Sequence, residues 1–319
     1  MKVMYPETAL VEERNPFLKI ERVGRTCYKS ESEFTEDTAF RFYQTLRDRK
    51  HFGIFEHVRF VFEVDAADYD FFNGCYERPY FVCTETLVNG KSRCLVSANL
   101  RALNEGRFAN YTYGAIPKFM ELLCENFSPE LDYTDVYDSI EPVYPVKVYR
   151  SIFDVENAQI NEIMAHTEVT AHFILDRGIS HEFVRHREFS FAQESTRYCN
   201  YGLDKFGKQI AVINPFVEQD VDKLAFYNWE TACRASEASY FNLLDRGVQP
   251  QNARSVLPTC LKTELMMTGT LNMWKHFFDL RYFELTGKAH PLAKFSATQA
   301  WNLMLEDSKY CVLEKSMWE

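Results

Sequence analysis

Two segments of the chain alternate apolar and other residues with a period of two, and this pattern constrains the fold more than any other. In residues 58–64, VRFVFEV, every even-numbered position is apolar while Arg59 and Glu63 lie on the opposite face, which predicts a half-buried strand. Residues 169–175, VTAHFIL, alternate in the same way. After Pro215 the apolar residues recur at helical spacing instead. Strands in one part of the chain and helices in another predict an α+β fold.

The other predicted elements follow from turn signals and helical spacing. Asn89-Gly90 is a favoured pair for a two-residue hairpin turn, and apolar segments flank it on both sides. We therefore expect strands over 79–87 and 92–97, and helices over 35–50, 221–244, 250–254, 270–282 and 292–306. Residues 105–157 show no clean periodicity, so no element is predicted there.

The composition is that of a folded chain with a surplus of acidic residues. The 319 residues are 46% hydrophobic and 26% charged, which excludes an intrinsically disordered chain. No apolar segment approaches the roughly 18 to 20 residues needed to span a bilayer, and residues 1–16 carry acidic side chains where a signal peptide needs an apolar segment. We therefore expect a cytoplasmic protein that does not bind membranes.

Charge and cysteine content exclude two further classes of protein. A formal net charge of −10 disfavours binding to nucleic acid, which requires an extended basic face. The nine cysteines are scattered and form no Cys-x-x-Cys pair, so neither a disulfide framework nor a zinc site is expected. A small anionic ligand would need only a local cluster of cations.

Residues 185–198, RHREFSFAQESTRY, form such a cluster. Guanidinium groups match phosphate oxygens in pairs, so the arginines at 185, 187 and 197 could build a phosphate site if the chain between them loops back. The same stretch could instead be a solvated helix end whose arginines pair with Glu188 and Glu194. Composition alone does not decide between these two interpretations.

Two other motifs in this region do not fit their chemistry. His181 and His186 resemble a His-Glu-x-x-His zinc signature, but they are five residues apart and therefore about 140° apart around a helix. No metal site is expected. Ser190 and Ser195 lie in no Gly-x-Ser-x-Gly turn, which argues against a hydrolase nucleophile and leaves hydrogen bonding in turns or caps as their alternative role.

The same stretch matches the motif of a known family at every fixed position. Arg185-His186-Arg187-x-x-Ser190-x-x-x-x-Ser195-x-Arg197 is identical to RHRxxSxxxxSxR of the flavin-dependent thymidylate synthases, which the chain therefore resembles. The resemblance covers about residues 15–65 and 165–300, in the family's order. Its other matching segments are RTCY at 25–28 before the first long helix, His51 with FEH at 55–57, ARSVLP at 253–258, and HFFDLR at 276–281 with Ala289-His290.

On this resemblance residues 1–319 form a single domain, with a mostly antiparallel sheet packed against long helices and an insertion of unknown role at about 66–165. The chain departs from the compact members of the family at several positions. Glu182 stands where glutamine is expected, and Gln193, Gln251, Thr270 and Asn272 also differ. These departures bear on individual contacts more than on the activity, because the arginines remain.

The activity that the resemblance implies is the reductive methylation of dUMP to dTMP. Methylenetetrahydrofolate supplies the methylene for carbon 5 of the uracil, FAD carries the hydride, and NADPH reduces the FAD. FAD and dUMP together carry several negative charges, so a cationic pocket that excludes water suits both. The other class of thymidylate synthase uses a cysteine in a Pro-Cys-His setting, and this sequence has no such tripeptide.

The resemblance also implies roles for individual residues. Arg281 is the candidate catalytic residue, because a guanidinium beside a uracil carbonyl stabilises negative charge that develops there. Ser195 is expected to assist by positioning the nucleotide, with neighbouring backbone amides as an anion nest. The expected cofactor-binding residues are His51, Glu56, Arg185, His186, Arg187 and His276. The expected substrate-binding residues are Glu182, Arg185, Gln193, Glu194, Ser195, Arg197, Arg254 and Arg281.

The resemblance implies a homotetramer with active sites at subunit junctions, and an exposed aromatic helix face over 270–283 would fit that assembly. Two other functions remain open. One is a catalytically silent flavin- or nucleotide-binding homologue with a regulatory role, favoured by the departures at Glu182, Thr270 and Asn272. The other is an RNA-binding protein, which the net charge opposes.

Overall fold

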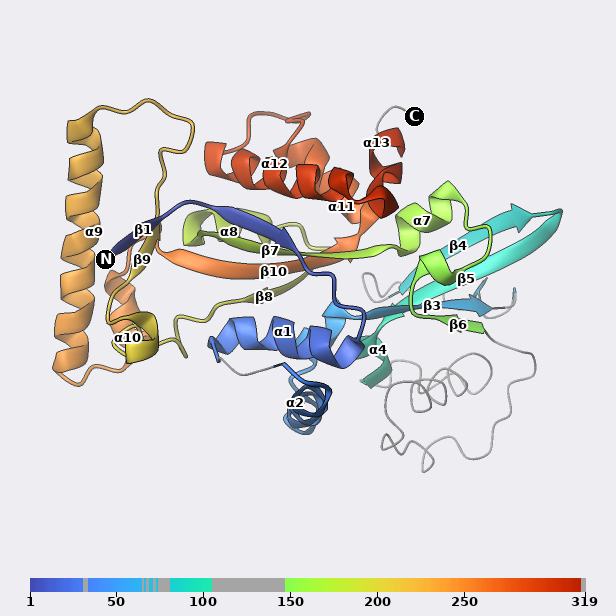
Figure 1. Cartoon of the computed structure of the whole chain (residues 1–319), viewed down its shortest axis with the longest axis horizontal. Helices are drawn as coiled ribbons and strands as arrows, with labels where there is room; N and C mark the ends of the chain where they lie inside the picture. Colours follow the sequence, from blue (N-terminus) through green and yellow to red (C-terminus); the bar gives the residue numbers. More distant parts are fainter. Residues whose placement is uncertain are drawn as a thin grey trace.

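The structure is a computed structural model that describes residues 1–30, 34–64, 81–104 and 147–316, with positions 66, 69, 70 and 73. Within this part of the chain, antiparallel sheets pack against helices (Figure 1), which confirms the predicted α+β class. A two-stranded parallel sheet departs from the antiparallel pattern. It pairs β1 (Lys2–Met4) with β9 (Ala211–Ile213).

The central sheet has the strand order β2-β7-β10-β8, and each neighbouring pair is antiparallel. Its strands are β2 (Glu7–Leu10), β7 (Glu168–Asp176), β8 (Ser190–Gln193) and β10 (Lys262–Thr270). β7 confirms the strand predicted over 169–175. Its Val169, Ala171, Phe173 and Leu175 are each at most 2% exposed and belong to one hydrophobic cluster, as the alternation predicted.

Helices α11 (Leu271–Arg281) and α12 (Pro291–Glu306) cover one side of the central sheet (Figure 1). Both confirm predicted helices. Trp274, Phe277 and Phe278 on α11 are completely buried against β7 and α12. The expectation of an exposed aromatic face over 270–283 is therefore wrong for these three rings, because the chain's own sheet and helix need them to complete the core.

Helix α1 (Pro16–Tyr28) lies on the opposite side of the central sheet, where Val23 packs with Ala192 and Met266. Residues 25–28 form the last turn of α1. Helix α2 (Glu36–Asp48) follows and confirms the helix predicted over 35–50, with Thr35 as its N-cap. The 3-10 helix η1 (Phe52–His57) then leads the chain into the second sheet.

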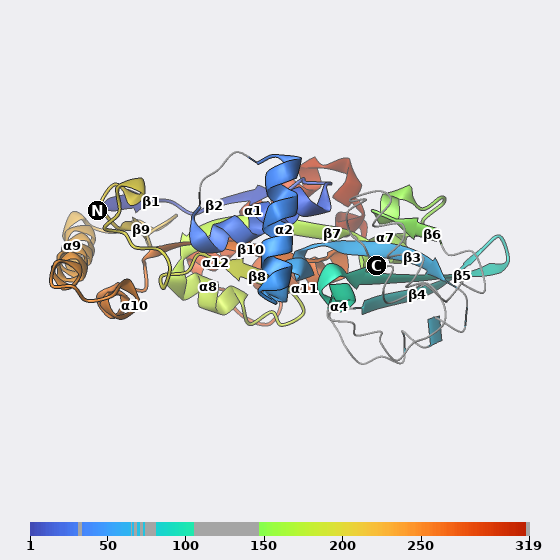
Figure 2. The ribbon, with the colours of Figure 1, turned by 90° about the horizontal axis from the view of Figure 1, so that it is seen from below.

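The second sheet extends the molecule beyond the central one (Figures 1 and 2) and has the antiparallel order β4-β5-β3-β6. Its strands are β3 (Arg59–Val64), β4 (Phe81–Val88), β5 (Lys91–Asn99) and β6 (Lys147–Tyr149). Val88 pairs with Lys91 across the predicted turn, where Asn89 and Gly90 both have positive φ, 52° and 78°. The hairpin prediction is confirmed.

The strand predicted over 58–64 exists as β3, but it is not half-buried. Its even-numbered residues pack in the cluster that holds α1 and α2, as predicted. The opposite face is covered too, because Val61 packs against Ile152 and Val155, and Arg59 is only 7% exposed. A segment about ninety residues later in the chain closes this face, and a local pattern does not reveal such a partner.

The C-terminal half supplies the remaining long helix. Helix α9 (Lys223–Asp245) stands at one end of the molecule (Figure 1) and ends before Gly247, whose φ is 80°. α10 (Pro250–Ala253) and η4 (Arg254–Val256) follow and confirm the short helix predicted before Pro258.

Short helical elements complete the described chain: α4 (Leu100–Asn104), η2 (Ile152–Asp154), α7 (Ile160–His166), α8 (Arg177–Phe183), η3 (Asp204–Phe206), η5 (Ser308–Tyr310) and α13 (Val312–Ser316). Of the insertion expected at about 66–165, residues 105–146 lie outside the described residues. Its described residues contribute β4, β5 and β6 to the second sheet. In the described part of the chain, no helix combines the length and apolar character needed to cross a membrane.

Candidate functional site

The signature stretch lies in the crossover between β7 and β8, two strands of the central sheet that run in the same direction on either side of β10. Asp176 ends β7 and caps α8, with its Oδ1 accepting a hydrogen bond from the Ile179 amide at 2.6 Å. The turn after α8 carries residues 185–188, and the chain then enters β8, which pairs antiparallel with β10. The order along the chain is therefore strand, short helix and basic stretch.

Five of the predicted site residues line one pocket of about 600 Å³: Arg185, His186, Arg187, His276 and Arg281. Three come from the turn after α8 and two from α11. The structure therefore brings the signature cations beside the later segment that the resemblance associated with flavin and substrate. Arg185 and Arg187 are exposed, so their charges are accessible to a ligand.

His186 is the buried member of this pocket, with only 8% of its surface exposed. Burial, helped by the positive charges of Arg281 and His276, lowers the pKa of His186 to about 4, so the ring is neutral at pH 7. Its Nδ1 lies 3.1 Å from the Phe183 carbonyl, which assigns the proton to Nδ1. Nε2 is then a buried acceptor, and no partner for it exists among the described residues.

Arg281 is the second anchor of the pocket. Its Nη1 donates to Glu182 Oε2 at 2.9 Å, while its buried Nε has no partner among the residues described. Nε of Arg281 and Nε2 of His186 thus offer one unused donor and one unused acceptor. A ring edge that carries an N–H beside a carbonyl oxygen offers one matching group to each atom.

Glu182 links this pocket to a second one of about 480 Å³. It lines the second pocket together with Asp176, Trp229 and His290, while Arg281, its ion-pair partner, lines the first. The glutamate at this departure from the family pattern therefore gives Arg281 a charged partner. Trp229, on α9, is partly buried and also lines this second pocket.

Glu56 and Ser190 meet although 134 residues separate them. The Ser190 hydroxyl donates to Glu56 Oε2 at 3.0 Å, and Arg101 forms an ion pair with Glu56 Oε1. Arg101 was not predicted, because it lies in the block that the resemblance does not cover. His51, at the start of η1, is exposed, and its side chain makes no hydrogen bond within the described residues.

Glu194 and Gln193 are engaged within the chain. Glu194 is 2% exposed, pairs with Lys262 at 2.8 Å and accepts a hydrogen bond from the Tyr201 hydroxyl at 3.1 Å. The Gln193 side-chain amide donates to Ser180 and Thr263 hydroxyls. Contacts within the chain therefore hold both side chains in place.

Lys262 also belongs to a larger group, which we call the ion cluster: Lys29, His172, Glu194, Lys262 and Glu264. Burial opposes ionisation of Glu264, but the hydrogen bond from His172 and the charges of Lys262 and Lys29 outweigh it and lower the Glu264 pKa. Lys262 and Glu264 are two residues apart on β10 and so lie on the same face of the strand, which is the one sign of this cluster in the sequence. Their partners at 29 and 172 carried none.

Ser195 organises the turn after β8. Its amide donates to the Cys27 carbonyl, its hydroxyl accepts from the Arg197 amide at 3.3 Å, and its carbonyl accepts from Tyr198 and Cys199. The amides of Ser195, Arg197, Tyr198 and Cys199 thus each have an acceptor within the chain. The turn satisfies its own backbone first.

Arg197 and Arg254 flank this turn. Arg197 is exposed and lies over the Tyr198 ring, 5.6 Å from its centroid. Arg254 Nη1 donates to the Thr196 hydroxyl at 3.1 Å, which ties η4 to the signature stretch. Thr196 was not predicted, because it occupies a variable position of the motif. Neither arginine lines the two pockets described above.

No group of three or more histidine, cysteine, aspartate or glutamate side chains that could hold a metal ion occurs in the described part of the chain. We define the candidate site as the two pockets that Glu182 and Arg281 connect, the turn at Ser195 and the residues that hold Glu56.

Known proteins resemble the part of the chain that contains the signature stretch. The family described as "Thymidylate synthase complementing protein" matches residues 138–299, just over half of the chain. A "Flavin-dependent thymidylate synthase" from Mycolicibacterium gilvum (strain PYR-GCK) is 32% identical over 151 residues, 42% of this chain and 56% of that protein. One of the same description from Pyrococcus furiosus is 32% identical over 108 residues, 34% of this chain and 43% of that protein.

The chain thus spans about half the length of the curated relatives that it matches. Among solved structures, the UMP/dUMP methylase PolB from Streptomyces cacaoi bound with 5-Br dUMP is similar with a TM-score of 0.44 and 13% identity, covering 99% of this chain and 96% of that one. Because the family match includes the signature stretch and more than half of the residues, the protein belongs to the thymidylate synthase complementing protein family, the family of the flavin-dependent thymidylate synthases.

Proposed function

We propose that the protein catalyses the reductive methylation of dUMP to dTMP, with methylenetetrahydrofolate as the one-carbon donor. Reduced FAD, regenerated by NADPH, supplies the hydride. In the balanced reaction the C5–H bond of uracil is replaced by a C5–CH₃ bond, and reduced FAD gives up a hydride and a proton to become oxidised FAD. The hydride completes the methyl group, and the nitrogens of tetrahydrofolate take up that proton and the C5 proton.

The observation that carries this proposal is the pocket shared by the signature turn and α11. It combines two exposed guanidinium groups, Arg185 and Arg187, with the unused acceptor of His186 and the unused donor of Arg281. Cations that reach solvent suit the pyrophosphate of FAD, and the buried donor and acceptor suit a ring edge. His276 completes the pocket wall.

Within this proposal Arg281 acts on the uracil. A guanidinium beside a ring carbonyl stabilises the negative charge that develops as carbon 5 becomes nucleophilic. The ion pair with Glu182 fixes its orientation, since one N–H group is held at 2.9 Å while Nε remains available. Neutral His186 cannot compete with Arg281 for that charge, and its Nε2 accepts from a ring N–H.

Arg197 and Arg254 would hold the dUMP phosphate, with Ser195 positioning the turn that carries Arg197. The Thr196 to Arg254 hydrogen bond supports this role, because it brings the second arginine to the same turn. His51 and Glu56 would contact FAD, and the exposed position of His51 leaves its ring accessible. Glu182, Gln193 and Glu194 would act by shaping the nucleotide site.

An anaerobic assay of dTMP formation tests the proposal. Purified protein receives dUMP, methylenetetrahydrofolate, FAD and NADPH, and each component is omitted in turn. We expect dTMP only in the complete mixture, and its loss in Arg187→Ala but not in the matched control Arg246→Ala, which removes an exposed arginine at the end of α9. Binding of FAD and dUMP without any dTMP would indicate a silent homologue instead.

We also propose a homotetramer, on the family resemblance alone. The buried rings of α11 are not available for its contacts. Light scattering at assay concentrations measures the assembly, and a fully active monomer would contradict it.

A further inference from the structure

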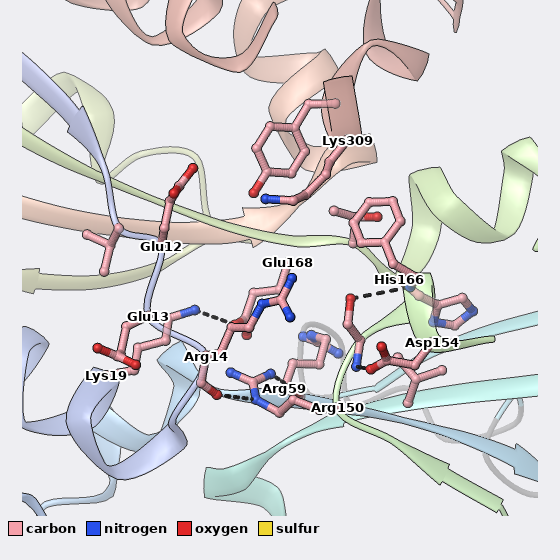
Figure 3. A pocket seen from close by; sticks show the side chains of 16 residues that line it. Glu12, Glu13, Arg14, Lys19, Arg59, Arg150, Asp154, His166, Glu168 and Lys309 are labelled. Atoms are coloured by element: carbon pink, nitrogen blue, oxygen red, sulfur yellow. Dashed lines mark hydrogen bonds and ion pairs between the residues drawn. The ribbon is translucent and has the colours of Figure 1, made fainter. Parts of the chain in front are cut away.

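A cavity of about 570 Å³ opens between the N-terminal segment 11–14, β3, the turn 150–154 and η5 (Figure 3). It shares no lining residue with either pocket of the candidate functional site. None of its residues has a role in the proposed methylation. Its volume lies within the roughly 300 to 1,000 Å³ that is typical of small-molecule sites.

Three cations form one wall of this cavity: Lys19 from α1, Arg59 from β3 and Arg150 from the turn after β6 (Figure 3). Lys19 is 3% exposed and pairs with Glu168, and Arg59 is 7% exposed. The whole lining holds five lysine and arginine side chains, these three included, against four carboxylates: Glu12, Glu13, Asp154 and Glu168. Lys309 adds a further, exposed amino group at the rim.

Backbone carbonyls hold the guanidinium group of Arg150 in place without neutralising it. Arg150 donates to the carbonyls of Arg14 at 2.9 Å and of Arg59 at 3.0 Å. Arg59 donates to the Ser97 carbonyl at 3.2 Å. No carboxylate lies within ion-pair distance of Arg150 among the residues that the structure describes. A fixed guanidinium that lacks a full counter-charge is preorganised for an anion.

The pKa values point in the same direction. Burial lowers the pKa of Lys19, Arg59 and Arg150, and Glu168 only partly opposes this. The charge of Arg150 depresses the Lys19 pKa further. Glu13 and Asp154 also raise the Arg150 pKa, and water screens the charge of Asp154, which is exposed. An anion would relieve the repulsion among the three cations.

Two buried oxygens of the cavity also lack partners in the described chain: Thr167 Oγ1 and Glu168 Oε2. The other oxygen of Glu168 is engaged by Lys19. An ionised carboxylate only accepts hydrogen bonds, so Glu168 Oε2 requires a donor from elsewhere. A hydroxyl group beside the anion would provide it and would also pair with Thr167.

We propose that this cavity binds a small phosphate ester that carries hydroxyl groups, with its phosphate against Arg59, Arg150 and Lys19 and a hydroxyl donating to Glu168. Guanidinium groups match phosphate oxygens in geometry and charge. Inorganic phosphate alone would leave most of the volume empty and Glu168 Oε2 without its donor.

Titration calorimetry with ribose 5-phosphate, inorganic phosphate and ribose tests the proposal on the full chain. We expect ribose 5-phosphate to bind more tightly than phosphate, and ribose not to bind. Arg150→Met should weaken ribose 5-phosphate binding roughly tenfold or more, because a charged hydrogen-bond donor is lost. Equal affinity for phosphate and its ester would overturn the assignment, as would no binding of either.

Two comparisons separate this site from the nucleotide site and from misfolding. Arg254→Met should leave ribose 5-phosphate binding unchanged. If Arg254→Met loses binding while Arg150→Met retains it, the probe binds at the nucleotide site and the proposal is overturned. Hydrogen exchange of the unmodified protein needs no variant. Ribose 5-phosphate should protect amides in segments 150–154 and 166–168 but not 195–199, and protection confined to the latter would contradict the proposal.

Discussion

The signature pocket and the ion cluster carry similar residue types but use them differently. In the signature pocket, Arg185 and Arg187 are two residues apart in sequence, exposed, and line one pocket. In the ion cluster, Glu194, Lys262 and Glu264 are largely buried and paired with one another. Cations without carboxylate partners are available to a ligand, whereas cations that neutralise buried carboxylates hold the fold. The two regions should therefore respond differently to the loss of one charge.

The largest effect on stability is expected in the ion cluster. Lys262→Met leaves the buried Glu194 and Glu264 without their shared cation, so the free energy of unfolding should fall by about 3 kcal/mol. Urea denaturation measures it. The matched control Lys208→Met breaks an exposed pair with Asp204 and should change that free energy by less than about 1 kcal/mol. Equal losses in the two variants would remove the distinction between the regions.

The largest effect on activity is expected at Arg281. Arg281→Ala removes the group that we propose stabilises charge on the uracil, so kcat should fall about 100-fold or more. The melting temperature should change little, since Glu182 is partly exposed. Glu182→Gln restores the residue expected of the family and should retain activity. A variant at Arg281 that keeps its kcat would assign the residue to structure alone.

A smaller effect separates the nucleotide from the cofactor. Arg254→Ala should weaken dUMP binding roughly tenfold, because a charged hydrogen bond to phosphate is lost, while FAD stays bound. Arg197→Ala should behave in the same way. Arg187→Ala and His51→Ala should instead lower the FAD content, measured by absorbance of the purified protein. If all four variants lose FAD alike, the division of roles is wrong.

The smallest effect is a dependence of stability on pH. Burial, with the charge of Arg59, lowers the pKa of His166 to about 3, so the folded state keeps this ring neutral while the unfolded chain protonates it below pH 6.5. Stability should therefore fall as the pH drops from 6.5 toward 3, by up to about 1.4 kcal/mol per pH unit from this residue. His166→Gln should reduce that slope in urea denaturation measured between pH 6.5 and 5. An unchanged slope would show that His166 is not the source.

The parts of the fold that the sequence predicted are those with local signals. The hairpin at Asn89-Gly90 depends on two neighbouring residues that accept positive φ. The buried face of β7 follows from the alternation of apolar residues along the strand. The covered outer face of β3 was missed, because its partners Ile152 and Val155 lie far along the chain.

The candidate site divides in the same way. The motif located the signature arginines, and the resemblance added His276 and Arg281, which α11 then brings to the same pocket. The ion cluster was missed because its members come from α1, β7, the end of β8 and β10 and meet only in the folded chain. Arg101 and Thr196 were missed for a similar reason, since Arg101 contacts Glu56 and Thr196 contacts Arg254 only in the folded chain.

The central claim is that the signature pocket binds a flavin that NADPH reduces and whose chemistry depends on dUMP. The most direct measurement is the visible spectrum of the purified protein, followed by anaerobic addition of NADPH with and without dUMP. We predict a flavin spectrum that bleaches, faster or more completely when dUMP is present. A protein that stays colourless and cannot be reconstituted with FAD would contradict the account.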